Sequence, residues 1–181
     1  MPIAELKMEL IKNFINGQYV SSESSAFIDI YEPATGDIYG QLKDSNANDI
    51  DYAVSSAKTA FPYWSGLSVR ERAVHLNNIA RGIEQRLDEF AEFESRDTGK
   101  PIALSRSLDI PRSILNFKFF ADYASQFEFN SNLNSESSQN HINMGPLGVV
   151  VCISPWNLPL YLFTWKIAPA LITGNTVIAK P

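Results

Sequence analysis

The sequence predicts an α/β fold in which a parallel sheet packs against a layer of helices. Two apolar runs typical of buried strands lie at 148–153 and 176–180, and a mostly apolar stretch of helical length separates them, from Pro159 to Ile172. A strand, a helix and a second strand form a βαβ unit, whose crossover is right-handed. We therefore expect the two strands to be parallel, with the helix packed on one face of the pair.

The N-terminal segment predicts two β-hairpins. Asn16 and Gly17 lie between the short apolar arms of "FINGQYV", and Asn-Gly is the strongest short-range hairpin signal. The stretch "IDIYEPATGDIYGQL" repeats the pattern, with Pro33 and Gly36 in a longer turn.

A helical layer is predicted from 48 to 126. Its first helix carries one apolar face, formed by Ile50, Ala53, Val54, Ala57, Ala60 and Phe61. Ser68 and Glu71 have the spacing of a capping box, which begins a second helix running to about Gln85.

Two more helices complete the predicted layer. One contains Phe90 and Phe93 and ends at Gly99, with Pro101 just beyond it. The other is "DIPRSILNFKFFADYASQ", for which Asp109 is the expected N-cap and Pro111 occupies the first turn, where its missing N–H costs nothing.

The segment that follows is polar. "NSNLNSESSQNHINMG", from Asn130 to Gly145, is rich in asparagine and serine and predicts a loop or an exposed hairpin arm. We expect residues 128–147 to project from the body of the fold. The run "GVVVCIS" then has the continuous apolar character of a strand buried on both faces.

Composition excludes several classes of function. The chain has 181 residues, 45% of them hydrophobic, and a net charge of −5, which indicates a globular protein and argues against nucleic-acid binding. Its single cysteine, Cys152, excludes an internal disulfide, and the two histidines have no ligand-spaced neighbours, so we expect no metal site. The N-terminus does not resemble a secretory signal and no apolar stretch is long enough to span a membrane, so we expect a cytoplasmic protein.

The candidate site lies where the two predicted strands end. Ser154, Pro155, Trp156 and Asn157 leave the carboxyl end of the first strand, and Lys180 occupies the carboxyl end of the second. Ligands of open α/β sheets bind at this edge. The G-x-G-x-x-G fingerprint is absent, and a lysine stands where an acidic ribose ligand is expected. From the residues alone, Asn157 is also a candidate helix N-cap, Lys180 an exposed strand end and Trp156 a core residue.

The same stretch resembles the first strand–helix–strand of the aldehyde dehydrogenase superfamily. It carries P-W-N-x-P, W-K-x-x-P-A-L and G-N-T-V-x-x-K-P in that order, and the resemblance extends over the whole chain. It implies that Asn157 is catalytic, donating its amide to the oxyanion of the aldehyde adduct. It also implies that Ile153, Ser154, Pro155 and Trp156 line a bound NAD (or NADP), and that Lys180 bonds the adenosine ribose.

A further resemblance concerns the substrate. The "DIPR" context of Arg112 is similar to that of the 2-aminomuconic and 2-hydroxymuconic semialdehyde dehydrogenases, which implies that Arg112 binds a substrate carboxylate with its guanidinium fork. The alternative is an arginine that lies on the surface near the start of a helix. Betaine-type and general aliphatic aldehyde dehydrogenases are the competing assignments.

The resemblance covers about the first third of a family subunit. It implies an incomplete NAD(P)-binding domain from 1–127 and 148–181, and an arm at 128–147 for oligomerisation into a homodimer or homotetramer. The nucleophilic cysteine and the glutamate base of the family belong to later segments, so we expect a fragment that is inactive alone. A short, non-catalytic pseudo-enzyme or assembly partner is the alternative; Cys152, mid-strand and apolar in context, is not expected to be the nucleophile.

Overall fold

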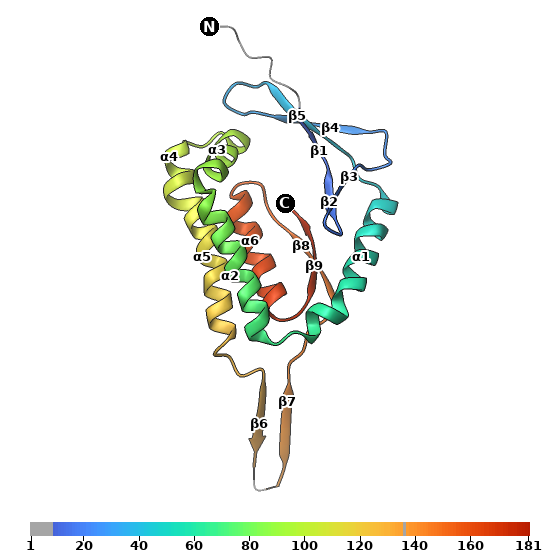
Figure 1. The fold of residues 1–181 in the computed structure, drawn as a ribbon, viewed down its shortest axis with the longest axis vertical. Helices are drawn as coiled ribbons and strands as arrows, with labels where there is room; N and C mark the ends of the chain where they lie inside the picture. Colours follow the sequence, from blue (N-terminus) through green and yellow to red (C-terminus); the bar gives the residue numbers. More distant parts are fainter. Residues whose placement is uncertain (1–8, 136) are drawn as a thin grey trace.

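The computed structural model describes residues 9–135 and 137–181, and it shows a body of helices and short sheets from which one hairpin extends (Figure 1). At the N-terminal end, β1 (Glu9–Ile11), β5 (Ile38–Lys43) and β4 (Phe27–Tyr31) form a three-stranded sheet in the order β1-β5-β4. β2 (Asn13–Ile15) and β3 (Gln18–Val20) pair separately as an antiparallel hairpin.

Both predicted N-terminal hairpins are confirmed. In the β2–β3 turn, Asn16 and Gly17 have positive φ angles of 52° and 75°, the backbone that an Asn-Gly hairpin turn requires. β4 pairs antiparallel with β5, and Gly36 in their connection has a φ of 80°.

The helical layer comprises α1 (Ala47–Gly66), α2 (Val69–Gln85), α3 (Leu87–Thr98), α4 (Ile102–Leu104) and α5 (Ile110–Ala124). Ser68 and Glu71 form the predicted capping box at the start of α2. Gly99 ends α3 in the left-handed conformation, also as predicted.

Asp109 immediately precedes α5 and Pro111 lies in its first turn, as predicted, but Asp109 does not cap the helix. Helical backbone already runs from Ile102 through a π-helical turn (η1, Ser105–Asp109), and Asp109 has helical dihedral angles and makes no side-chain cap bond. Pro111 cannot donate a backbone hydrogen bond, and an inserted π turn is one way for a helix to accommodate such a position. The Asp109 carboxylate instead binds Lys100.

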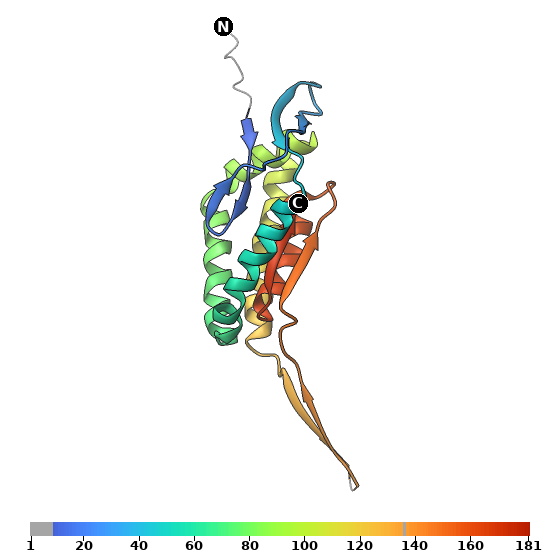
Figure 2. The ribbon, with the colours of Figure 1, turned by 90° about the vertical axis from the view of Figure 1, so that its right-hand side faces the viewer.

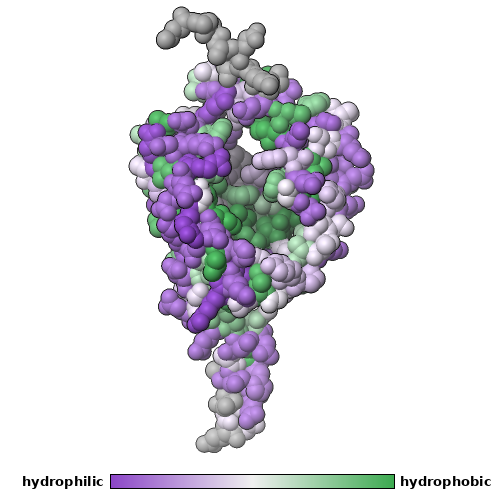
Figure 3. Space-filling view, viewed as in Figure 1, coloured by the Kyte–Doolittle hydropathy of each residue, from purple (hydrophilic) through white to green (hydrophobic). Residues whose placement is uncertain are grey.

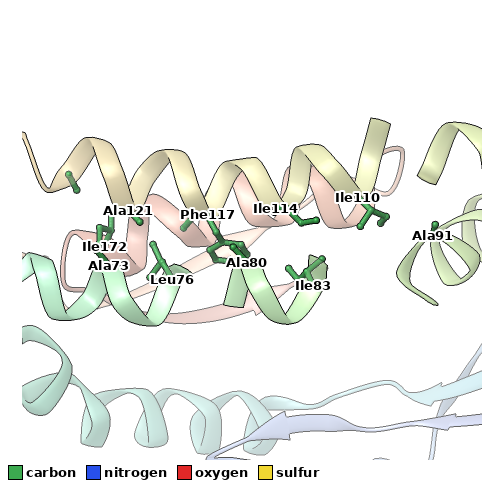
Figure 4. Packing of buried hydrophobic residues seen from close by; sticks show 12 residues of the cluster. Ala73, Leu76, Ala80, Ile83, Ala91, Ile110, Ile114, Phe117, Ala121 and Ile172 are labelled. Atoms are coloured by element: carbon green, nitrogen blue, oxygen red, sulfur yellow. The ribbon is translucent and has the colours of Figure 1, made fainter. Parts of the chain in front are cut away.

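The hydrophobic core lies between α2, α5 and α6 (Pro159–Ile172) (Figure 4). Leu76 of α2, Phe117 of α5 and Ile172 of α6 are among its largest fully buried side chains. Alanines at 80, 121 and 168 are completely buried and allow the helices to approach one another closely. These contacts fix α6, and with it the segment immediately before α6.

β8 (Val149–Ile153) and β9 (Thr176–Lys180) are parallel, and α6 connects them, as the βαβ prediction requires. Figure 1 draws the pair between α6 and α1, and both helices contact it. Burial on both faces is not found, since Val151 and Ile153 of β8 are exposed. Their side chains alternate with buried Cys152, so one face of β8 is open to solvent over its carboxyl-terminal part within the described chain, whereas Val149 on the same face is half-buried.

α1 is a helix as predicted, but its apolar face is only partly covered. Ile50 is exposed, and α1 contains no fully buried residue among those described. The Thr176 hydroxyl donates to the Ala57 carbonyl at 3.0 Å, which joins α1 to the start of β9. Figure 3 shows a hollow with hydrophobic residues at its floor, in the place where Figure 1 draws α6 and the β8–β9 pair.

The polar segment forms β6 (Asn130–Asn134) and β7 (Gln139–Asn143), which pair antiparallel. The hairpin projects well beyond the helices in both side views (Figures 1 and 2), as the sequence predicts. No element of the described chain pairs with its outer edges.

Candidate functional site

The carboxyl ends of β8 and β9 meet at one edge. Ile153 lies opposite Lys180 in the parallel register, and the Ser154 N–H donates to the Lys180 carbonyl at 3.0 Å. The structure therefore brings together the elbow Ser154–Asn157 and Lys180, which are 23 or more residues apart in the sequence. The predicted position of the site, at the carboxyl edge of a parallel pair, is that of a ligand site in an open α/β sheet.

The residues of this edge differ in what they offer to a ligand. Ile153 and Trp156 are 63% and 88% exposed, and Pro155 is exposed too. Ser154 is buried, and its hydroxyl finds no hydrogen-bond partner within the described residues. A molecule lying along the edge can therefore contact main chain and the side chains of Ile153, Pro155 and Trp156, whereas the Ser154 side chain points into the protein.

Asn157 does not cap α6. The N-cap of α6 is Leu158, which makes no side-chain cap bond. Asn157 is exposed, and across the described ranges its amide makes no hydrogen bond to another protein group. Its carbonyl oxygen lies 3.5 Å from the Lys100 ammonium. The main chain is thus held while the amide N–H groups remain free to bind a ligand oxygen.

Lys180 ends β9 with an exposed side chain. Its ammonium reaches the Pro181 carbonyl at 2.7 Å, a neighbouring main-chain acceptor. The charged group lies at the same sheet edge as Ile153 and Ser154, where it can donate to ribose hydroxyls or attract phosphate.

Arg112 is an exposed residue of α5, and α5 packs against α6, the helix that follows the elbow. Its guanidinium stacks over the Tyr161 ring of α6 at 5.3 Å, and Tyr161 in turn makes an edge contact with Trp165. Tyr161 follows Asn157 by about one helical turn. The Asn116 amide donates to the Tyr161 carbonyl at 3.1 Å and fixes α5 against this part of α6. Arg112 makes no ion pair with a carboxylate in the part of the chain that the structure describes.

A cluster of buried charged side chains contacts the main chain of Asn157, and the sequence did not predict it. It consists of Glu94, Lys100 and Asp109, and the Lys100–Asp109 contact measures 2.7 Å. Burial raises the pKa of the Glu94 carboxyl, against the opposing effects of the Leu160 N–H and the Lys100 charge. Lys100 follows a helix-ending glycine and Asp109 lies two residues before a proline, but nothing in the sequence indicates that their side chains meet.

Cys152 is buried in β8, and burial raises the pKa of its thiol. A thiolate is the reactive form of cysteine, so this environment suppresses nucleophilic reactivity. Among the described residues no group of His, Cys, Asp and Glu side chains is arranged to hold a metal ion. Nor does any described helix combine the length and the apolar character that crossing a bilayer demands.

Comparison with known proteins agrees with the geometry. Residues 19–181 match the model of the "Aldehyde dehydrogenase family". The chain is 46% identical over 173 residues to 2-aminomuconic semialdehyde dehydrogenase of Homo sapiens, covering 95% of this chain and 35% of the relative. It is 43% identical over 180 residues to 2-hydroxymuconic semialdehyde dehydrogenase of Pseudomonas sp. (strain CF600), covering 96% and 37%.

A solved structure shares the fold. The crystal structure of PnpE in complex with nicotinamide adenine dinucleotide superposes with a TM-score of 0.88 at 38% identity, over 94% of this chain and 35% of that chain. The chain thus spans about a third of the length of the curated relatives it matches.

Proposed function

The chain belongs to the aldehyde dehydrogenase family, and we propose that the complete protein oxidises a carboxylate-bearing semialdehyde to the acid with NAD as the acceptor. The substrate class is that of 2-aminomuconic or 2-hydroxymuconic semialdehyde. The observation that carries the proposal is the Asn157 amide, which is exposed and unengaged by the described protein groups. It lies in the elbow that follows β8, and the first residue of this elbow, Ser154, bonds the Lys180 main chain.

The role proposed for Asn157 is to stabilise developing negative charge on the aldehyde oxygen. A thiolate attacks the carbonyl carbon, the new C–S bond forms, and the π electrons of the carbonyl move to oxygen. An amide donates a hydrogen bond to that oxygen without carrying a charge of its own. In the family this thiolate and the glutamate that activates water belong to later segments, so we place both outside these 181 residues and expect the chain alone to be inactive.

The cofactor role is proposed for Ile153 to Trp156 and for Lys180. Exposed main chain and apolar side chains at the end of β8 suit the flat surfaces of a dinucleotide, and the Lys180 ammonium suits its ribose hydroxyls. The PnpE complex, which shares this fold, contains the same dinucleotide. When bound, NAD accepts the hydride that leaves the aldehyde carbon.

The substrate role is proposed for Arg112. Stacking on Tyr161 holds the guanidinium plane on the α6 side of α5, about one turn from Asn157, and leaves its N–H groups free of carboxylate partners in the described chain. A planar guanidinium binds a carboxylate through two parallel hydrogen bonds. The relatives named after muconic semialdehydes support this substrate class.

The complete gene product tests the function directly. We expect reduced cofactor to form when the purified enzyme is given NAD and 2-hydroxymuconic semialdehyde, at a higher kcat/KM than with betaine aldehyde or with an aliphatic aldehyde of similar length. Parallel assays with NADP measure the cofactor preference. A higher kcat/KM for either of the substrates without a carboxylate would contradict the semialdehyde assignment.

We also propose that residues 128–147 are an oligomerisation arm attached to a cofactor domain formed by 1–127 and 148–181. The β6–β7 hairpin leaves its outer edges unpaired in the described chain, and free strand edges are a template for pairing with another chain. Replacing 130–143 by a short turn in the complete enzyme should lower the oligomeric state from a homodimer or homotetramer, as measured by light scattering. An unchanged molar mass would show that the arm is not needed for assembly.

A further inference from the structure

Three charged side chains from outside the elbow lie buried together next to Asn157. Glu94 comes from α3, Lys100 from the turn after Gly99, and Asp109 from the end of the π-helical turn. The Lys100 ammonium lies 2.7 Å from Asp109 and 3.6 Å from Glu94. The side chains of Asp109 and Lys100 are only 1% and 13% exposed.

One member of this cluster contacts the main chain of the elbow, and another contacts the first turn of α6. Lys100 donates to the Asn157 carbonyl oxygen at 3.5 Å. The Leu160 N–H donates to Glu94 Oε2 at 3.4 Å. Because Pro159 has no N–H and the N-cap Leu158 makes no side-chain bond, Glu94 supplies from another helix the acceptor that the start of α6 otherwise lacks.

The cost of such a cluster indicates that it does more than fill space. Removing three charges from water is expensive, and a buried ion pair is often no more stable than apolar residues of the same shape. Apolar residues, however, could not bind the Asn157 carbonyl or the Leu160 N–H. The contacts that an apolar replacement would lose are those with Asn157 and with the start of α6.

We propose that Lys100, anchored by Asp109, is a positioning residue that orients Asn157 for its reaction. The inference rests on the proposed oxyanion role of Asn157. The ammonium binds the Asn157 carbonyl and so restricts the main-chain dihedral angles of this residue, while Glu94 holds the next turn at Leu160. Together they fix the direction in which the exposed amide points. The Lys100 side chain is largely buried, so in this proposal it acts through the Asn157 main chain.

The test is a double-mutant cycle in the complete enzyme. Lys100→Met alone would leave Asp109, the nearer of its two carboxylate partners, without a cation. The variant used is therefore Lys100→Met/Asp109→Asn, which removes the charges of the closest pair, keeps the side-chain shapes and leaves Glu94 in contact with Leu160. Its kcat, expressed per NAD-binding site so that unfolded protein does not count, should fall roughly tenfold, because small displacements of a reacting group are costly. KM for NAD should be nearly unchanged. Neutralising the exposed pair between α5 and α2, with Lys118→Met/Glu84→Gln, is the matched control and should leave kcat at the wild-type value.

The decisive comparison is with Asn157→Ala. If Lys100 acts through Asn157, adding Lys100→Met/Asp109→Asn to Asn157→Ala should lower kcat no further. An additional tenfold loss in that background, or no loss in the wild-type background, would overturn the positioning role while leaving the oxyanion role intact. A normal kcat for Asn157→Ala itself would overturn the oxyanion role, and the positioning inference with it.

Discussion

Replacing Arg112 by alanine in the complete enzyme should raise KM for a carboxylate-bearing semialdehyde by about ten- to a hundredfold. Loss of a charge-assisted contact costs on the order of 1.5–3 kcal/mol, and this range corresponds to the stated factor. The kcat should change less, because the carboxylate contact is made equally in the ground state and the transition state. Steady-state kinetics with varied semialdehyde measure both constants.

Two controls separate the charge of Arg112 from its packing on Tyr161. Arg112→Met keeps an unbranched stem that can lie against the ring but has no charge, so its KM should rise nearly as much as that of the alanine variant. A simple aliphatic aldehyde should be almost unaffected by either substitution. Equal losses on both substrates would show that Arg112 supports the structure and does not recognise a carboxylate.

The parts of the fold that depend on local sequence were predictable. The Asn16-Gly17 turn, the Ser68–Glu71 capping box and the helix end at Gly99 each rest on backbone chemistry within four residues. The parallel pairing of β8 and β9 was predictable for another reason, since a helix between two apolar strands permits essentially one hand of connection. That pairing also puts the end of β9, with Lys180, next to the start of the elbow.

The buried charge cluster was not predictable, because it depends on how separate helices pack. Asp109 before a proline has the local pattern of a helix start, yet the chain is already helical and inserts a π turn instead. The carboxylate thereby binds Lys100, which follows the left-handed Gly99 at the end of α3. Likewise, the Arg112–Tyr161 contact follows from the packing of α5 on α6, which no single helix pattern specifies.

The exposed apolar side chains of β8 are a second difference from expectation. A continuous apolar run indicates a strand covered on both faces, whereas Val151 and Ile153 are open to solvent in this chain. The face they form adjoins the elbow, which itself carries the exposed Trp156. Apolar surface next to the site is what a flat dinucleotide needs as a support, which agrees with the cofactor role proposed for this edge.

The largest effect is expected for Asn157→Ala in the complete enzyme. Its amide should bind the oxyanion more strongly than the uncharged aldehyde, so its removal acts on turnover. Loss of one oxyanion donor typically lowers kcat by a factor on the order of 10² to 10³, and we expect a loss of this size with nearly unchanged affinity for NAD. Asn157→Asp, which has the same shape but a negative charge beside the developing oxyanion, should be at least as slow.

The melting temperature of Asn157→Ala distinguishes an oxyanion role of Asn157 from a role in holding the fold. Asn157 is exposed, Leu158 occupies the N-cap of α6, and the Asn157 amide binds no other described protein group, so truncating it removes no contact that holds the fold. The melting temperature of Asn157→Ala, measured by calorimetry, should therefore stay close to that of the wild type, although its kcat falls by the factor given above. A variant that melts early but keeps its kcat at low temperature would assign the residue to the fold. Turnover that falls while the melting curve and the NAD titration stay in place would assign its amide to the oxyanion.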